Sequence, residues 1–293
     1  MNFGTKLHGD YKKAWIDGMR DWNNRMPERM VDDRLEEQFW QEYLERRKKK
    51  PEPHAYAVHI MEELLPLLQS DDSVLEIGPG WGNYTFEAAR RVKQYSCFDS
   101  SKSVLTYLQE AAAASWIDGM EFLHGKWEEY AAEADAYDVV FGINCFYRMQ
   151  DIDRAMLNMN RAARRLAVVG MTSGPEPAHL WEIHRKLGYR MKFTRRDYIY
   201  ITNVLYQLGI DVNCRIIPLE RTYSFDSVEQ FIEEQLKKIV EPEFDRVAVE
   251  RIVSSYIEDI DGKPGYRHRF KAALLYWRPE AELPALQTHK GLE

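Results

Sequence analysis

The chain has 293 residues, 45% of them hydrophobic, which is enough for a full α/β core and about one additional layer or cap. No apolar run approaches the ~20 residues that a membrane span needs. The N-terminus lacks the apolar stretch of a secretory signal. The three cysteines show no C-x-x-C spacing, which argues against a disulfide scaffold or a cysteine zinc site. We therefore expect a cytoplasmic protein with no membrane partner and no bound metal.

The net charge of −7 argues against a nucleic-acid partner, because proteins that neutralise phosphates usually carry a basic surplus on one face. One basic run, at residues 46–50, follows an acidic stretch at residues 36–45. The run is most simply the cationic end of a helix, where positive charge is favourable to the helix dipole. A nucleic-acid patch is the alternative interpretation.

The first 55 residues are predicted to form a helical cap rich in aromatic side chains. Apolar residues recur there at helical spacing in two stripes, namely Tyr11, Trp15, Met19, Trp22 and Met26, and then Phe39, Trp40, Tyr43 and Leu44. Pro51 and Pro53 interrupt the pattern. A further helix is expected after them, with an apolar face of Val58, Met61, Leu64, Leu65 and Leu68.

From Ser73 onward, short apolar runs alternate with amphipathic helices, which is the pattern of a parallel sheet with helices on both faces. Strands are predicted at residues 74–77, 95–98, 121–123, 137–143 and 166–171. Helices are predicted after Gly82, at residues 101–114 and at residues 151–165.

The remaining sequence is less regular. A polar stretch at residues 172–197 leads into a helix through Tyr200 and Val204, which Gly209 ends. Further elements are predicted as a strand at 216–225, helices at 228–239 and 249–260, and a strand at 270–277. We expect one domain over residues 56–280 with an insertion around residues 172–214, followed by a C-terminal tail at residues 281–293.

The segment between the first two predicted strands carries the strongest chemical signal. Glu76 is followed by Gly78, Gly80 and Gly82 at a strand-to-helix junction, where glycines let a ligand approach the backbone closely. Their G-x-G-x-G spacing differs from the G-x-G-x-x-G of dinucleotide-binding proteins. Asp99 ends the next strand, 21 residues after Gly78, which suits a carboxylate accepting hydrogen bonds from a ribose. A simple tight turn and a nicotinamide-binding domain are the competing interpretations.

This E-x-G-x-G-x-G motif, with an acidic residue ending the second strand, resembles the class I S-adenosylmethionine-dependent methyltransferase family over about residues 56–171. The resemblance implies a Rossmann-like, mostly parallel seven-stranded sheet, S-adenosyl-L-methionine as cofactor and S-adenosyl-L-homocysteine as product. It implies that Glu76 orients the glycine loop and the methionine end of the cofactor, and that Gly78, Gly80 and Gly82 pack against the methionine and ribose. Asp99 would hold the ribose diol, with a strand end or helix cap as its alternative role.

The same resemblance assigns residues after the second, third and fourth strands. Ser100 would add a backbone contact near the adenine. The family often has Gly-Asp where this chain has Gly125-Lys126, and a lysine cannot accept a hydrogen bond. The backbone of Lys126 and the ring of Trp127 are therefore expected to bind the adenine, with core packing as the alternative role for Trp127. Asn144 would contact the cofactor through its backbone.

Acceptor-binding residues are expected at the end of the fourth strand and in the N-terminal helices. By the resemblance, Tyr147 and Arg148 would face the substrate. Trp15 and Trp22 would join them if the first helices cover the crevice at the strand ends. The alternative is that this aromatic stripe packs on the back of the sheet or on another subunit.

A base is needed only if the methyl acceptor has a proton to lose. Tyr147, His179 and His184 are the candidates, and each histidine is alternatively an ordinary surface or core residue. The chain lacks the Asn/Asp-Pro-Pro-Tyr motif of enzymes that methylate the amino groups of adenine or glutamine, and the Pro-Cys pair of cytosine C5 enzymes.

The acidic charge, the aromatic N-terminal helices and the insertion favour a methyltransferase that acts on a small-molecule acceptor. An enzyme acting on RNA or protein would need a basic patch or a recognition domain, and neither is visible in the sequence. A nucleotide-binding oxidoreductase would need a different glycine spacing. A non-catalytic protein would bind S-adenosylmethionine without turnover.

Overall fold

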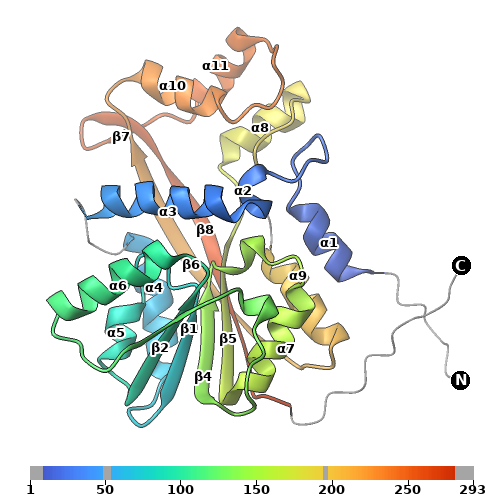
Figure 1. The fold of residues 1–293 in the computed structure, drawn as a ribbon. Helices are drawn as coiled ribbons and strands as arrows, with labels where there is room; N and C mark the ends of the chain where they lie inside the picture. The colour runs from blue at the N-terminus through green and yellow to red at the C-terminus, as the bar shows by residue number, and fades with distance from the viewer. Residues whose placement is uncertain (1–8, 49–53, 194–196, 281–293) are drawn as a thin grey trace, which may run out of the picture.

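The computed structural model in Figure 1 describes residues 9–48, 54–193 and 197–280, which fold around one eight-stranded sheet. The sheet order is β3-β2-β1-β4-β5-β8-β6, and β7 pairs with β8 outside this path. The strands are β1 (Ser73–Ile77), β2 (Gln94–Asp99), β3 (Glu121–His124), β4 (Tyr137–Ile143), β5 (Ala163–Ser173), β6 (Asn213–Ser224), β7 (Glu258–Ile260) and β8 (Lys263–Trp277).

The predicted Rossmann-like, mostly parallel sheet is confirmed. Parallel pairing joins β3, β2, β1, β4 and β5, whereas β8 runs antiparallel to β5 and β6. β7 is an additional strand where the sequence predicts the end of a helix, because the chain turns back at Gly262 to pair residues 258–260 with β8. The order of strands reverses between β1 and β4, which opens a crevice at their carboxyl ends.

Helices cover both faces of the sheet, and within the described ranges none is long and apolar enough to cross a membrane. They are α1 (Tyr11–Gly18), α2 (Glu28–Val31), α3 (Asp33–Arg47), α4 (Ala55–Leu64), α5 (Thr85–Ala89), α6 (Lys102–Ala114), α7 (Ile152–Ala162), α8 (Ala178–Leu187), α9 (Asp197–Gln207), α10 (Val228–Leu236) and α11 (Arg246–Ser254). Short 3-10 turns are η1 (Leu65–Leu67), η2 (Trp127–Glu129) and η3 (Phe146–Arg148).

The core has one apolar cluster on each face of the sheet. Alternate residues of a strand point to opposite faces. Val140 of β4 therefore packs in the cluster that includes α1, α7 and α9, whereas Val139 and Phe141 pack in the cluster that includes α4, α5 and α6. Burial on both faces explains why the central strands are almost continuously apolar.

A third apolar cluster joins α8, α10 and α11 to the far ends of β6 and β8, at the top of Figure 1. Leu180 and Ile183 of α8 pack there with Phe231 and Val249. α8 corrects the predicted polar stretch at residues 172–197, since these two apolar residues stand among charged neighbours that conceal the helical pattern. α9 packs instead against β5 and α1.

The first aromatic stripe forms a shorter helix than its spacing predicts. α1 ends at Gly18, after which the chain turns. Trp15 is fully buried, and its indole N–H donates to the carbonyl oxygen of Met149 at 2.7 Å. Trp22 lies beyond the helix, is 47% exposed, and donates to the carbonyl oxygen of Met191 at 2.6 Å.

α3 lies across the carboxyl ends of the parallel strands (Figure 1). The side chain of Asp32 caps this helix by accepting from the amide of Arg34. Three of its carboxylates reach the segments that follow β2, β3 and β4, through the pairs Glu37–Ser103, Asp33–Lys126 and Glu36–Tyr147. α3 therefore forms a roof over the crevice.

α4 begins after the break predicted at Pro51 and Pro53, a segment that lies outside the described residues. The predicted helix is present, but its buried face is formed by Ala57, Ile60 and Leu64, and Val58 is exposed. Met61, Leu65 and Leu68 pack partly buried against the same cluster as Leu64, so the sequence pattern located the helix and most of its apolar face, with Val58 as the exception.

The burial of Trp15 predicts that the N-terminal segment contributes to stability. Replacing Trp15 with alanine removes a fully buried indole and its hydrogen bond, and should lower the free energy of unfolding by about 3–5 kcal/mol. Urea denaturation followed by circular dichroism measures this change. Trp116→Ala is the matched control, because Trp116 is 90% exposed, and it should change stability little. Equal effects of the two substitutions would contradict the packing of α1.

Candidate active site

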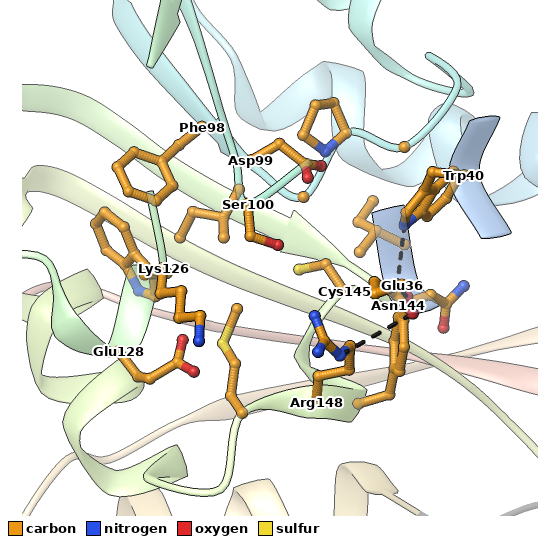
Figure 2. Close-up of a pocket in the computed structure, with 18 of the residues that line it drawn as sticks. Glu36, Trp40, Phe98, Asp99, Ser100, Lys126, Glu128, Asn144, Cys145 and Arg148 are labelled. Carbon is orange, nitrogen blue, oxygen red and sulfur yellow. Dashed lines mark hydrogen bonds and ion pairs between the residues drawn. The ribbon is translucent and has the colours of Figure 1, made fainter. Parts of the chain in front are cut away.

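A cavity of about 710 Å³ lies beneath α3 at the carboxyl ends of β1, β2, β3 and β4 (Figure 2). Its size is in the range of small-molecule and cofactor sites. Figure 2 shows Lys126 and Glu128 on one side of the cavity and Glu36, Trp40 and Arg148 on the other. The predicted glycine loop and the end of β4 thus meet in one site with α3.

The glycine loop lies too close to neighbouring side chains to carry side chains of its own. Gly78 and Gly80 have φ of +59° and +58°, in the left-handed region, and both line the cavity. A Cβ on Gly78 would lie 2.2 Å from the Cβ of Cys145. Gly82 lies behind the loop, where a Cβ would be 2.7 Å from the ring of Phe86. The first two glycines are therefore at the cavity surface and the third is a packing residue.

Glu76 lies at the base of the cavity and is 2% exposed. Its Oε2 accepts hydrogen bonds from the hydroxyl groups of Thr85 at 2.6 Å and Tyr95 at 2.7 Å. Burial raises the pKa of Glu76 to about 7, although these two hydrogen bonds act in the opposite direction. Its carboxyl group ties β1 to β2 and to the helix after the glycine loop.

Asp99 ends β2 at the cavity and is 8% exposed. Its Oδ1 accepts from the amide of Ser101 at 2.8 Å, while Ser101 itself caps α6. Burial raises the pKa of Asp99 to about 7, and the negative charges of Glu36 and Glu37 add to this increase. Ser100 lines the cavity beside it. A buried carboxyl group is thus available at the predicted ribose position.

Of the two predicted residues after β3, Lys126 lies at the cavity and Trp127 lies mainly in the core. Lys126 lines the cavity, and its ion pair with Asp33 at 2.7 Å raises its pKa. Trp127 is 1% exposed and donates from its indole N–H to the carbonyl oxygen of Ala155 at 3.0 Å. Its ring packs on Phe98 while part of its surface reaches the cavity. Trp127 therefore has a core environment as well as a place at the site.

Glu128 is a carboxylate at this end of the cavity that the sequence analysis missed (Figure 2). Burial raises its pKa. Glu128 lies two residues after Lys126. It therefore supplies a carboxyl group on the side of the cavity where the family's Gly-Asp pair would have supplied one. The signal available in the sequence was an acidic residue slightly displaced from the expected position.

Asn144 follows β4 with φ of +55°, a conformation that asparagine tolerates better than most residues. Its Oδ1 accepts from the amide of Thr172 at 2.7 Å and from the hydroxyl of the same residue at 3.1 Å. The side chain thereby ties the end of β4 to β5, and the residue lines the cavity.

Glu36 is the second residue that the sequence analysis missed. It comes from α3, is 3% exposed and lines the cavity. Its Oε1 accepts from the hydroxyl of Tyr147 at 2.5 Å and from the indole N–H of Trp40 at 3.0 Å. Burial and the Glu36 charge raise the pKa of Tyr147 well above its usual range. The spacing of four residues between Glu36 and Trp40 places both on one face of α3, but nothing in the sequence marks a glutamate on that face as buried.

Two arginines approach the other oxygen of Glu36. Arg29 Nε lies 3.0 Å from Oε2, and Arg148 Nε lies 4.0 Å from it. Arg148 also pairs through its terminal nitrogen with Asp33 at 2.9 Å. The predicted acceptor residues Tyr147 and Arg148 thus surround a carboxylate from the N-terminal cap.

The other predicted acceptor residues do not line this cavity. His179 is 1% exposed within the third apolar cluster, 2.9 Å from Oε1 of Gln235, and burial lowers its pKa. His184 contacts the carbonyl oxygen of Tyr189 at 2.8 Å. Trp15 and Trp22 make the core and carbonyl contacts described above, and Ile16 lines the cavity instead.

Metal-ligand clusters are absent from the part of the chain that the structure describes, where no group of three or more His, Cys, Asp or Glu side chains is arranged to hold an ion. The chemical groups of the site are therefore its carboxylates, arginines, aromatic rings and exposed backbone.

Comparison with known proteins finds one matching domain family and several structures of the same fold. Residues 74–166 match the family described as a methyltransferase domain. A Bacillus halodurans protein classed as a methyltransferase has a TM-score of 0.52 at 16% identity, over 75% of this chain and 99% of that chain. No curated protein sequence gives a significant match.

Two further solved structures share the fold. The YcgJ protein of Bacillus subtilis has a TM-score of 0.50 at 14% identity, over 78% of this chain and 100% of that chain. A chain from a Haloferax volcanii complex of a methyltransferase with its activator has a TM-score of 0.51 at 14% identity, over 84% of this chain and 97% of that chain. At these identities the likeness shows the fold.

The raised pKa of Asp99 predicts a pH-dependent effect of its substitution. The pKa rises from 3.8 to about 7 on folding, so the folded state holds the proton more tightly than the unfolded state. Its contribution to stability is therefore full below about pH 4 and is lost as the pH rises to about 7. Asp99→Asn removes this titration and should gain stability relative to the unsubstituted protein over that interval, by about 4 kcal/mol. Urea unfolding at several pH values measures the difference, and parallel stability curves would contradict it.

Proposed function

We propose that this chain is an S-adenosylmethionine-dependent methyltransferase, as the match of residues 74–166 to a methyltransferase domain supports, and that it methylates a small-molecule acceptor in the cavity beneath α3. The observation that carries this proposal is the enclosure of the cavity by the N-terminal segment. The ring of Trp40 lies 3.2 Å from where a Cβ of Gly80 would be, and Glu36 is 3% exposed. Such a roof leaves room for a cofactor and a small acceptor and limits the access of water to the reacting groups.

S-adenosylmethionine supplies an electrophilic methyl group on its sulfonium centre. We assign its methionine and ribose portion to the backbone at Gly78 and Gly80, where the missing side chains leave space for close approach. Glu76 holds this loop, and Asp99 accepts from the ribose hydroxyl groups. The acidic lining suits a cofactor that carries net positive charge.

The adenine is assigned to the side of the cavity after β2 and β3. Ser100 and Lys126 would offer backbone groups, and Trp127, which lines the cavity although it is almost fully buried, would offer an apolar contact. Glu128 is added to this set because its carboxyl group reaches the cavity where an acceptor for the adenine amino group is needed. Asn144 contributes backbone, since its side-chain oxygen is bound to Thr172.

The acceptor is assigned to the opposite side, around Tyr147, Arg148 and Glu36. His179, His184, Trp15 and Trp22 have no part in this proposal because they do not line the cavity. Trp15 supports the site indirectly, since it packs beneath the carbonyl group of Met149 next to η3.

The domain organisation is proposed as a helical cap at residues 1–55 and a methyltransferase domain at residues 56–280. α3 acts as the roof of the site within that cap. The insertion around residues 172–214 contributes α8 to the third apolar cluster and α9 to the sheet. The proposed tail at residues 281–293 lies outside the described residues.

Asp99 should be a main determinant of cofactor affinity. We expect S-adenosylmethionine and S-adenosylhomocysteine to bind in the micromolar range, about 8 kcal/mol. Asp99→Ala removes a charged acceptor and should weaken binding by roughly 1.5–3 kcal/mol. Isothermal calorimetry measures both values, with Asp118→Ala on an exposed loop as control. A preference for a nicotinamide dinucleotide over S-adenosylmethionine would overturn the cofactor assignment.

The small-molecule assignment predicts that the protein does not bind RNA. With a net charge of −7, the protein should show no salt-sensitive binding to bulk transfer RNA. Filter binding at several salt concentrations tests this expectation. Submicromolar binding that weakens steeply as salt increases would favour the alternative, a methyltransferase that acts on a macromolecule.

A further inference from the structure

Two buried polar atoms in the acceptor half of the cavity have no hydrogen-bond partner among the described residues. They are Oε2 of Glu36 and Nε of Arg148. Both residues line the cavity, and Figure 2 shows their side chains directed toward each other across its edge. The two atoms are 4.0 Å apart, which is too long for a hydrogen bond between them. Glu36 Oε2 is ion-paired with Arg29 Nε at 3.0 Å but makes no hydrogen bond, whereas Arg148 Nε has only the 4.0 Å approach to Glu36 among the described residues. A third group between the two atoms would pair Arg148 Nε and add a hydrogen bond to Glu36 Oε2.

The two atoms have opposite hydrogen-bonding roles. A carboxylate oxygen only accepts, and a guanidinium nitrogen only donates. A single group that satisfies both must donate one hydrogen bond and accept another at the same atom. A hydroxyl group does this, whereas an ammonium group only donates and would leave Arg148 unpaired.

The existing ion pairs favour an oxygen group over an ammonium group. Glu36 has Arg29 at 3.0 Å, and Asp33 has Lys126 at 2.7 Å and Arg148 at 2.9 Å. An ammonium group would therefore find neither of these two α3 carboxylates unpaired. A hydroxyl group that loses its proton would be stabilised by the Arg148 guanidinium.

Aromatic side chains flank the same position. Phe39 and Tyr147 line the cavity beside Glu36, with Arg29 lying over the Phe39 ring at 3.8 Å. Trp40 holds Glu36 from the other side through its indole N–H. Flat apolar walls of this kind suit a planar aromatic ring.

We infer that the methyl acceptor is a phenol whose hydroxyl group binds between Glu36 and Arg148, an inference that rests on the proposed function. The phenol donates to Glu36 Oε2 and accepts from Arg148 Nε. The acceptor oxygen forms its bond to the methyl carbon while the carbon–sulfur bond of the sulfonium breaks. Glu36 takes the hydroxyl proton, so the products are a methyl ether, neutral S-adenosylhomocysteine and a protonated carboxyl group. Arg148 stabilises the negative charge that develops on the oxygen.

The experiment uses the full chain saturated with S-adenosylhomocysteine and two probes of matched shape. One probe is 4-methylphenol, whose hydroxyl stays protonated near neutral pH, and the other is 4-methylaniline, which presents an amine in place of the hydroxyl. Calorimetry should show that the phenol binds about tenfold more tightly than the aniline, because only the phenol satisfies both atoms. Glu36→Gln and Arg148→Lys should each reduce phenol affinity about tenfold and reduce the preference for phenol.

Controls separate this inference from the proposed function. S-adenosylhomocysteine affinity should be unchanged in both variants, which also shows that they fold. Glu42→Gln, on the exposed side of the same helix, should leave phenol binding unchanged. No detectable phenol binding, equal binding of the two probes, or an undiminished phenol affinity in Glu36→Gln would overturn the inference while the proposed function stands. Failure of the unsubstituted protein to bind S-adenosylhomocysteine would overturn the proposed function itself.

Discussion

The contact between the glycine loop and the end of β4 is the constraint on which the site depends. A Cβ at Gly78 would lie 2.2 Å from the Cβ of Cys145, so the turns after β1 and β4 touch without room for a side chain. These two strands are parallel neighbours at the point where the sheet order reverses. Their carboxyl ends therefore open into one crevice, and residues from 76 to 80 and from 144 to 148 share it. The roof formed by α3 rests on the same junction, because Tyr147 follows directly from it.

The two sides of this cavity differ in how their negative charge is compensated. Asp99 accepts an amide hydrogen bond, and it has no ion pair within the described part of the chain. Burial consequently raises its pKa, and a bound hydrogen-bond donor would stabilise its ionised form. Glu36 already has Arg29 at 3.0 Å and a hydroxyl donor in Tyr147. The cavity is thus prepared for a cationic ligand on one side and for a neutral or developing anionic group on the other.

Local patterns were sufficient for the central strands of the sheet, because each of them is a continuous apolar run and the glycine motif occupies the seven neighbouring positions 76–82. They missed β7, which is defined by its pairing with β8. The proposed cofactor residues are drawn from that motif and the strand ends, and most of them line one cavity. Glu36 could not be found this way, since its burial depends on a partner 111 residues away and a glutamate in an acidic helix looks solvated. Trp22 was misassigned for the same reason. Its spacing continues the helical pattern past Gly18, but the helix ends there and Trp22 donates to the distant carbonyl oxygen of Met191 from the segment that follows. Long-range contacts, rather than helix propensity, decided both.

Burial of Glu36 also links the roof to the chemistry beneath it. A carboxylate leaves water at a large cost unless donors and positive charge replace its hydration. For Glu36 these come from α3 itself through Trp40, from the preceding segment through Arg29 and from the end of β4 through Tyr147. The helix is therefore stable over the crevice only when the acceptor side is assembled. The packing that places α3 over the cavity therefore also places Glu36, the proposed proton acceptor, beside the acceptor. This accounts for a buried glutamate on the face of α3 that is otherwise aromatic.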